Sequence, residues 1–176
     1  MPKSPLKFQQ IFEAFLDKEK ELKVISVASC TKQAKPNSAS KMLVNIQAPN
    51  KLYFLDYKVT QSYHNILENP CISISFMDDA AFTGYRLTGA CKILESGPEF
   101  EAASKSWERR LIAYEAERII QRMTGRYSTR EAERSLPKDF VIIKLEASEG
   151  SVVKPSRVLR AAQGENPALD DQHSTS

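Results

Sequence analysis

The chain has 176 residues, of which 41% are hydrophobic and 27% are charged, and its formal net charge is +3. A chain of this length can form one domain with a buried core, and its balanced charge argues against a dedicated nucleic-acid-binding protein, which would carry a basic stripe. No apolar run reaches the ~18–20 residues of a membrane-spanning helix. The first residues lack the layout of a secretory signal, so we expect a cytoplasmic protein that binds neither nucleic acid nor membranes.

The three cysteines, Cys30, Cys71 and Cys91, are far apart in the sequence and form neither a CxxC pair nor a cluster with histidine. This spacing argues against a zinc site, and we expect no bound metal. Because a free cysteine behaves as a small hydrophobic residue, we expect reduced thiols that are mostly buried.

In the first half of the chain, the sequence predicts two helices and three strands. The apolar residues Ile11, Phe12 and Phe15 recur at helical spacing, whereas β-branched residues concentrate after residue 23. Pro36 and Pro49, each followed by Asn, are typical of turns, and short connections favour antiparallel neighbours. The expected elements are a helix over 6–22, strands over 23–30, 38–46 and 51–57, and a short helix over 60–68.

In the second half, three strands flank a long charged helix that ends near Gly125. Gly89 lies inside a strand, where it indicates a β-bulge or a close approach of two backbones. Trp107 and Tyr114 form an aromatic stripe on the helix, which is typical of a core or a dimer interface. The expected elements are strands over 71–77, 85–94 and 139–147, a helix over 99–123 with another turn or two over 127–136, and a polar, disordered tail over 161–176.

Together these elements predict an α+β fold in a single domain over residues 1–160. About six mostly antiparallel strands would form a small closed or half-closed barrel with peripheral helices.

Three polar residues, Thr60, Gln61 and Ser62, stand where the short helix begins, directly after an apolar strand. A helix amino terminus exposes unpaired N–H groups and a partial positive charge, which suit a phosphate group. The three side chains would add hydrogen-bond donors there. The alternative is that Thr60 only caps the helix, and the pattern alone leaves both possibilities open.

Lys41 lies between Ala39 and Leu43 on an otherwise small and apolar strand face. A lysine is rarely buried unless it is paired. It is either a surface lysine on an edge strand or a cation that faces an anionic ligand. His64 has no partner at a spacing that suggests a catalytic triad, so no catalytic residue is identified.

Several segments follow one another in a recognisable order, namely a strand ending in SC, a Lys-Pro-Asn turn, SASKML, LYFLDY, NILENP, CISISF and GYRLTGACKILESGPEFE. In this order and spacing they resemble the FMN-binding split-barrel family, also called the pyridoxamine 5'-phosphate oxidase-like family. The likeness covers residues 24–103 well and 140–145 loosely. It implies a six-stranded, mostly antiparallel split β-barrel that forms a homodimer, with two FMN molecules in the clefts between the subunits.

The resemblance also implies which segments bind FMN. In such proteins the second strand, and the turn and helix start after the third strand, hold the phosphate, while strand backbones meet the flavin ring. On this chain those segments supply the cofactor-binding residues Ser38, Ser40, Lys41, Met42, Asp56, Tyr57, Lys58, Thr60, Gln61 and Ser62. FMN would carry out the redox chemistry, and the protein would orient and tune it.

The chain departs from true pyridoxamine-phosphate oxidases at the phosphate. Those enzymes carry an Arg and a Lys where this chain has Ser40 and Asn45, and an Arg-Lys pair where it has Gln61 and Ser62. The resemblance therefore implies a small FMN-binding member that acts as an oxidoreductase on an unidentified small molecule rather than on vitamin B6. The alternative is a non-catalytic protein on the same scaffold that binds a flavin, a deazaflavin or haem.

Overall fold

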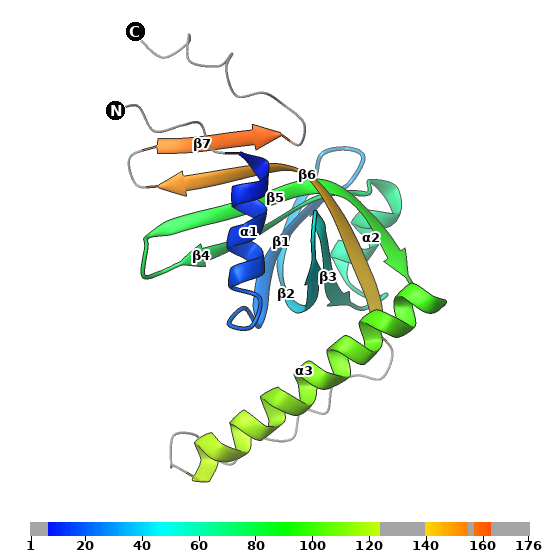
Figure 1. Ribbon diagram of the computed structural model, residues 1–176. Helices are drawn as coiled ribbons and strands as arrows, with labels where there is room; N and C mark the ends of the chain where they lie inside the picture. Colours follow the sequence, from blue (N-terminus) through cyan, green and yellow to red (C-terminus); the bar gives the residue numbers. More distant parts are fainter. Residues whose placement is uncertain (1–6, 124–139, 155–156, 163–176) are drawn as a thin grey trace, which may run out of the picture.

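The computed structural model describes residues 7–123, 140–154 and 157–162. The elements, shown in Figure 1, are α1 (Phe8–Asp17), β1 (Val24–Cys30), β2 (Pro36–Gln47), β3 (Lys51–Asp56), α2 (Gln61–Glu68), β4 (Cys71–Asp78), β5 (Thr83–Leu94), α3 (Pro98–Met123), β6 (Val141–Lys154) and β7 (Arg157–Ala162). No helix in the described ranges is long and apolar enough to cross a membrane. The turns expected over 127–136 lie outside the described residues, as do residues 163–176 of the expected tail, whereas its first two residues, 161 and 162, belong to β7.

Six strands close into an antiparallel barrel. Neighbouring strands follow the order β3-β2-β1-β4-β5-β6, and the pairing of β3 with β6 completes the ring. This confirms the predicted α+β fold with a six-stranded split β-barrel and peripheral helices. β6 continues to Lys154, well past its predicted end at residue 147, and β7 pairs with this extension as a strand that the sequence did not predict.

The barrel interior is a single apolar core that α1 helps to fill. On β1, Ile25 and Val27 point inward at every second position, as the period of a strand requires. α1 contributes Phe8, Ile11, Phe12 and Phe15 to the same core. The helix ends at Asp17 instead of the predicted residue 22, because the chain enters turns there, but Leu22 still packs against the core.

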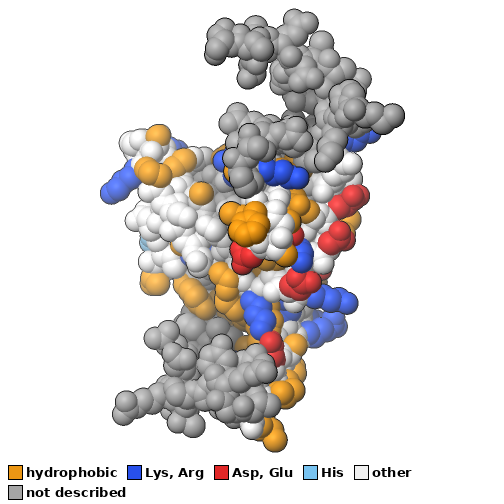
Figure 2. Space-filling view, turned by 90° about the vertical axis from the view of Figure 1, so that its left-hand side faces the viewer, with side chains coloured by type: hydrophobic (Ala, Val, Ile, Leu, Met, Phe, Trp, Pro, Cys, Tyr) orange, Lys and Arg blue, Asp and Glu red, His pale blue; other side chains and the backbone are white. Residues whose placement is uncertain are grey.

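α3 lies against the outside of the barrel and then extends away from it (Figure 1). Trp107 is 3% exposed and packs with Val44 and Tyr53 in a second apolar cluster, which confirms that it is a core residue. The far end of the helix is different, since Ile119 and Met123 are 55% and 84% exposed. Figure 2 shows orange side chains at the lower end of the described surface, where this part of α3 lies.

Gly89 stands at a β-bulge between β5 and β6. The register of the two strands shifts between Thr88 and Gly89. A Cβ atom at position 89 would lie 2.1 Å from the backbone oxygen of Glu146, so only glycine fits. Both features that the sequence suggested for this residue are therefore confirmed.

The prediction that the cysteines are mostly buried is wrong. Cys71 is exposed, and Cys30 and Cys91 are only half-buried. Cys30 and Cys71 lie at strand ends on outer positions, where the alternation of the sheet, more than residue type, decides exposure. Cys91 faces the core from β5 but is only partly covered.

Candidate functional site

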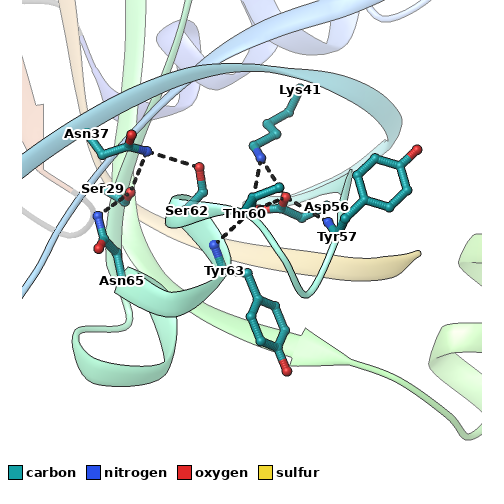
Figure 3. A network of polar contacts seen from close by, with 9 residues as sticks. All are labelled: Ser29, Asn37, Lys41, Asp56, Tyr57, Thr60, Ser62, Tyr63 and Asn65. Atoms are coloured by element: carbon teal, nitrogen blue, oxygen red, sulfur yellow. Dashed lines mark hydrogen bonds and ion pairs between the residues drawn. The ribbon is translucent and has the colours of Figure 1, made fainter. Parts of the chain in front are cut away.

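Lys41 and Asp56 meet inside one end of the barrel (Figure 3). Lys41 points inward from β2, Asp56 ends β3, and their side chains are only 8% and 0% exposed. The ammonium nitrogen of Lys41 lies 2.5 Å from Oδ1 of Asp56. Since β2 is flanked by β1 and β3, Lys41 is not a surface lysine on an edge strand, and that alternative is wrong.

Asp56 holds the polypeptide between β3 and α2 in place. Its Oδ1 also accepts hydrogen bonds from the hydroxyl of Thr60 at 2.7 Å and from the backbone N–H of Tyr57 at 2.8 Å. Its Oδ2 is buried and has no hydrogen-bond partner within the described residues. One oxygen of this carboxylate is therefore fully engaged, and the other has unused acceptor capacity.

Thr60 caps α2. Its backbone is extended, and its hydroxyl oxygen accepts a hydrogen bond from the N–H of Tyr63 at 3.1 Å. The capping role considered from the sequence is thus confirmed. It does not exclude anion binding, because the N–H groups of Gln61 and Ser62 in the first turn have no carbonyl within the helix to pair with.

A second set of polar contacts ties α2 to β1 and β2 (Figure 3). The amide of Asn37 donates to the hydroxyl of Ser62 at 3.1 Å, and the amide of Asn65 donates to Ser29 at 3.1 Å. Gln61 donates to the amide oxygen of Asn65 at 2.7 Å. Ser62 is 1% exposed, and its hydroxyl already accepts the hydrogen bond from Asn37. Its side chain therefore stabilises the start of the helix and does not face solvent.

Lys58 and Glu95 form an ion pair at the solvent-exposed rim of this region. Their closest N···O distance is 2.9 Å, and the hydroxyl of Tyr63 donates to the same carboxylate at 3.1 Å. These two hydrogen bonds lower the pKa of Glu95. Burial, reinforced by the neighbouring Asp56 carboxylate, raises the pKa of Tyr57. Both lysines expected near a ligand, Lys41 and Lys58, are therefore paired with carboxylates.

The outer face of the barrel beside this network carries small side chains in two registered rows. One row runs Ser40–Ser26–Ser75 across β2, β1 and β4 and meets the exposed Arg86 on β5, and the other runs Ser38–Ala28–Ser73–Thr88 as far as β5. We call this surface the hydroxyl face. Ser73 and Thr88 bond to each other at 2.6 Å, and Ser26 and Ser38 lie 3.4 Å apart. Such short side chains leave the strand surface flat.

The ten predicted cofactor-binding residues fall into three groups by exposure. Lys41, Asp56 and Ser62 are buried, Met42, Tyr57 and Thr60 are half-buried, and Ser38, Ser40, Lys58 and Gln61 are exposed. The structure brings Lys41, Asp56, Tyr57 and Thr60 into direct contact. Ser38 and Ser40 lie on the opposite side of β2 from Lys41, and Met42 packs against the α3 cluster.

Sequence reasoning missed five residues of the network, namely Ser29, Asn37, Tyr63, Asn65 and Glu95. Two of them carried a usable signal. Ser29 continues the inward alternation of Ile25 and Val27, and an inward polar side chain needs a partner. Asn65 follows Gln61 by four positions, so the two share a helix face. Glu95 offered no signal, since its partner Lys58 is 37 residues away.

The network is suited to binding and orienting a polar ligand. It presents helix N–H groups, the exposed amide of Gln61 and the rim lysine next to the flat hydroxyl face. No group of three or more His, Cys, Asp or Glu side chains able to hold a metal occurs in the described part of the chain. A separate hollow lined by Met77, Asp79, Phe82, Val153 and Lys154 lies near the other end of β4 and shares no residue with the network.

Residues 11–154 match the protein family described as Pyridoxamine 5'-phosphate oxidase. No curated protein matches the chain significantly.

Solved structures with the same fold have low sequence identity. A Clostridium acetobutylicum protein related to general stress protein 26 of B. subtilis, of the pyridoxinephosphate oxidase family, has a TM-score of 0.61 and 15% identity, with 88% of this chain and 95% of that chain covered. A pyridoxamine 5'-phosphate oxidase-related, FMN-binding protein from Nostoc punctiforme has a TM-score of 0.53 and 12% identity, and the match covers 89% of this chain and 88% of that chain. A heme-binding protein from Mycobacterium smegmatis has a TM-score of 0.61 and 14% identity, and the match covers 86% of this chain and 57% of that chain.

Proposed function

The chain belongs to the pyridoxamine 5'-phosphate oxidase family, and on that basis we propose that it binds FMN between the subunits of a homodimer and acts as a flavin-dependent oxidoreductase on a small molecule. The observation that carries the proposal is the placement of the α2 amino terminus, with its first-turn N–H groups, beside the ends of β2 and β3 in a split barrel. The fold similarity to an FMN-binding protein from Nostoc punctiforme supports it.

The phosphate end of FMN would lie at the start of α2. The N–H groups of Gln61 and Ser62, the partial positive charge of the helix and the exposed amide of Gln61 fit the oxygen atoms of a phosphate. Lys58 at the rim would add a cation, and Thr60 and Ser62 hold the backbone in position through their bonds to Asp56 and Asn37.

The flavin ring would lie over the hydroxyl face, where Ser38 and Ser40 are exposed. A planar ring needs a flat bed, and short side chains allow it to approach the strand backbones. The same surface, which is uncharged from β2 to β4 and bordered by Arg86 on β5, would receive the second subunit, so that the ring is enclosed between two protomers and shielded from water. From β2 to β4 the registered side chains of this surface carry hydroxyl and methyl groups, which orient a ligand by hydrogen bonding and contact.

When bound, FMN supplies the electron transfer, and the residues described above bind it, orient it and exclude water. Within the described residues, the site offers no paired acid and base for catalysis, so we assign binding roles only. The cytoplasmic location remains a prediction from the sequence.

Haem is the second candidate ligand. It is favoured by the fold similarity to the heme-binding protein from Mycobacterium smegmatis. Among the described residues, His64, which is exposed on α2 and packs edge-on against Tyr63, would be the histidine ligand of the iron.

The absorbance spectrum of the purified protein, combined with mass analysis of any co-purified ligand, tests both candidates. A flavin spectrum with the mass of FMN supports the proposal. A Soret band supports haem instead. A colourless protein whose spectrum and thermal stability do not respond to added FMN contradicts the proposal that the chain binds FMN.

A further inference from the structure

Asp56 is the most unusual group in the candidate site, because it places a buried negative charge where a phosphate is expected to bind. Its carboxylate is 0% exposed, and it neutralises Lys41 at 2.5 Å. At the rim, Glu95 does the same for Lys58 at 2.9 Å. The four side chains together carry no net charge, since two ammonium groups face two carboxylates.

Resting on the proposed function, we propose that Asp56 sets the ligand preference of the site. It acts as the internal counter-ion of Lys41, so that the phosphate group of FMN contributes little to binding and the site accepts unphosphorylated riboflavin almost as tightly as FMN. Asp56 is thus a specificity-determining residue, and the ligand class is the flavin with its hydroxylated side chain rather than the phosphomonoester.

The electrostatic argument follows from the burial of the pair. A phosphate dianion close to Lys41 would also be close to Asp56, and in a weakly polar interior the repulsion acts at nearly the same strength as the attraction. Lys41 could reach the phosphate only by leaving Asp56, which would strand a buried carboxylate without its cation. The helix N–H groups would still face a phosphate, as would Lys58, which is paired with Glu95, but both act at the exposed rim, where water screens them.

The unpartnered oxygen of Asp56 points to the kind of group that the site favours. Oδ2 is buried and accepts no hydrogen bond from the described residues, although such groups are nearly always paired. A carboxylate oxygen needs a donor, and the hydroxyl groups of a ribityl chain are donors, whereas a fully ionised phosphate has none. Because Asp56 is 0% exposed, a ligand hydroxyl reaches this oxygen only when the start of α2 shifts, and it would then satisfy Oδ2 without displacing Lys41.

The test compares the dissociation constants of FMN and riboflavin, measured by quenching of flavin fluorescence with the full chain. The wild type is expected to bind the two flavins within about tenfold of each other, a difference of no more than ~1.4 kcal/mol. In Asp56→Asn, Oδ1 can still accept from Thr60 and Tyr57, and only the unpartnered oxygen becomes an amide. This variant leaves the charge of Lys41 without its counter-ion, so the affinity for FMN relative to that for riboflavin should rise by at least about tenfold.

Glu95→Gln is the matched control, because it removes the same charge from the exposed pair. Solvent screening should limit its effect on the FMN-to-riboflavin ratio to about threefold. The double variant Lys41→Met/Asp56→Leu replaces the whole buried pair with apolar side chains, and it should keep the wild-type ratio. It provides a second test if Asp56→Asn folds poorly in thermal melts.

Three results would overturn the inference. A wild type that prefers FMN more than about a hundredfold would show that the phosphate is held strongly, and an unchanged ratio in Asp56→Asn would remove the role of Asp56. A double variant that loses FMN but keeps riboflavin would show that Lys41 binds the phosphate. In all three cases flavin binding itself stands. Failure of both flavins to bind would instead overturn the proposed function together with this inference.

Discussion

The ammonium group of Lys41 and the carboxylate of Asp56 form an ion pair that solvent scarcely reaches, with 2.5 Å between Nζ and Oδ1. The pair joins two neighbouring strands, β2 and β3, just where the chain turns into α2. A buried pair of this kind is costly to break, because the remaining charge has no partner, although replacing both members costs much less. The pair therefore couples the stability of the barrel end to the position of the helix start.

Removal of Lys41 alone should destabilise the protein strongly. Lys41→Met leaves the carboxylate of Asp56 buried without its cation, and we expect a loss of about 3–5 kcal/mol in the free energy of unfolding. Lys41→Met/Asp56→Leu should recover most of this loss. Urea unfolding followed by circular dichroism measures both values. Equal destabilisation of the single and double variants would show that the charge pairing is unimportant.

Gly89→Ala should disrupt the bulge between β5 and β6. The new methyl group would lie 2.1 Å from the carbonyl oxygen of Glu146, so the strands must separate, at a cost of at least about 2 kcal/mol. Gly84→Ala on the same strand is the control. There the nearest atom, on Val153, is 3.7 Å away, and stability should change little. Similar melting temperatures for the two variants would contradict the close approach at Gly89.

Stability should fall in acid partly because of Glu99, which anchors the first turn of α3 to the barrel. Burial opposes its ionisation, but hydrogen bonds from Lys144 and Tyr53 outweigh that effect and lower the pKa of Glu99 from its ordinary 4.5. A carboxyl with a lower pKa in the folded chain stabilises the fold above its unfolded pKa. That contribution is lost as the pH falls through the folded value.

Glu99→Gln should accordingly flatten the acid side of the stability profile below about pH 4.5. Urea unfolding at a series of pH values measures it, with Glu101→Gln, an exposed residue of the same turn, as the control. An acid profile that is the same in Glu99→Gln as in the wild type would refute the anchoring role.

The three thiols should differ in reactivity. Burial raises the pKa of Cys91 to about 12, so its thiolate is scarce near neutral pH, whereas Cys71 is exposed. We expect iodoacetamide to alkylate Cys71 first and Cys91 last in the native protein. Peptide mass analysis over a time course gives the order. Early modification of Cys91 would mean that β5 opens more readily than its pairing with β4 and β6 suggests.

The barrel itself could be predicted because its strands carry strong local signals. The alternation of Ile72, Ile74 and Phe76 and the turn at Pro49 depend on neighbouring residues alone, and they mark features that the structure contains. Pro36, which was expected in a turn, instead begins β2 and pairs with Cys30. β7 was missed because it forms by pairing with the extension of β6, which no local pattern announces.

The candidate site shows the limit of the same reasoning. The capping role of Thr60 is local, and it was anticipated. The pairing of Lys41 with Asp56 spans 15 positions and depends on the register of β2 against β3, which includes an irregularity near Val44. The resemblance placed both residues near a ligand, but only the folded chain shows that they face each other and that Ser38 and Ser40 lie on the opposite side of the strand.

The central claim is that a flavin binds between two copies of this chain. Native mass spectrometry of the purified protein, with and without added FMN, tests it most directly. The account predicts a dimer that carries two FMN molecules, formed on purification or on addition of the flavin. A protein that stays monomeric, or a dimer that takes up no flavin at saturating FMN, would contradict it.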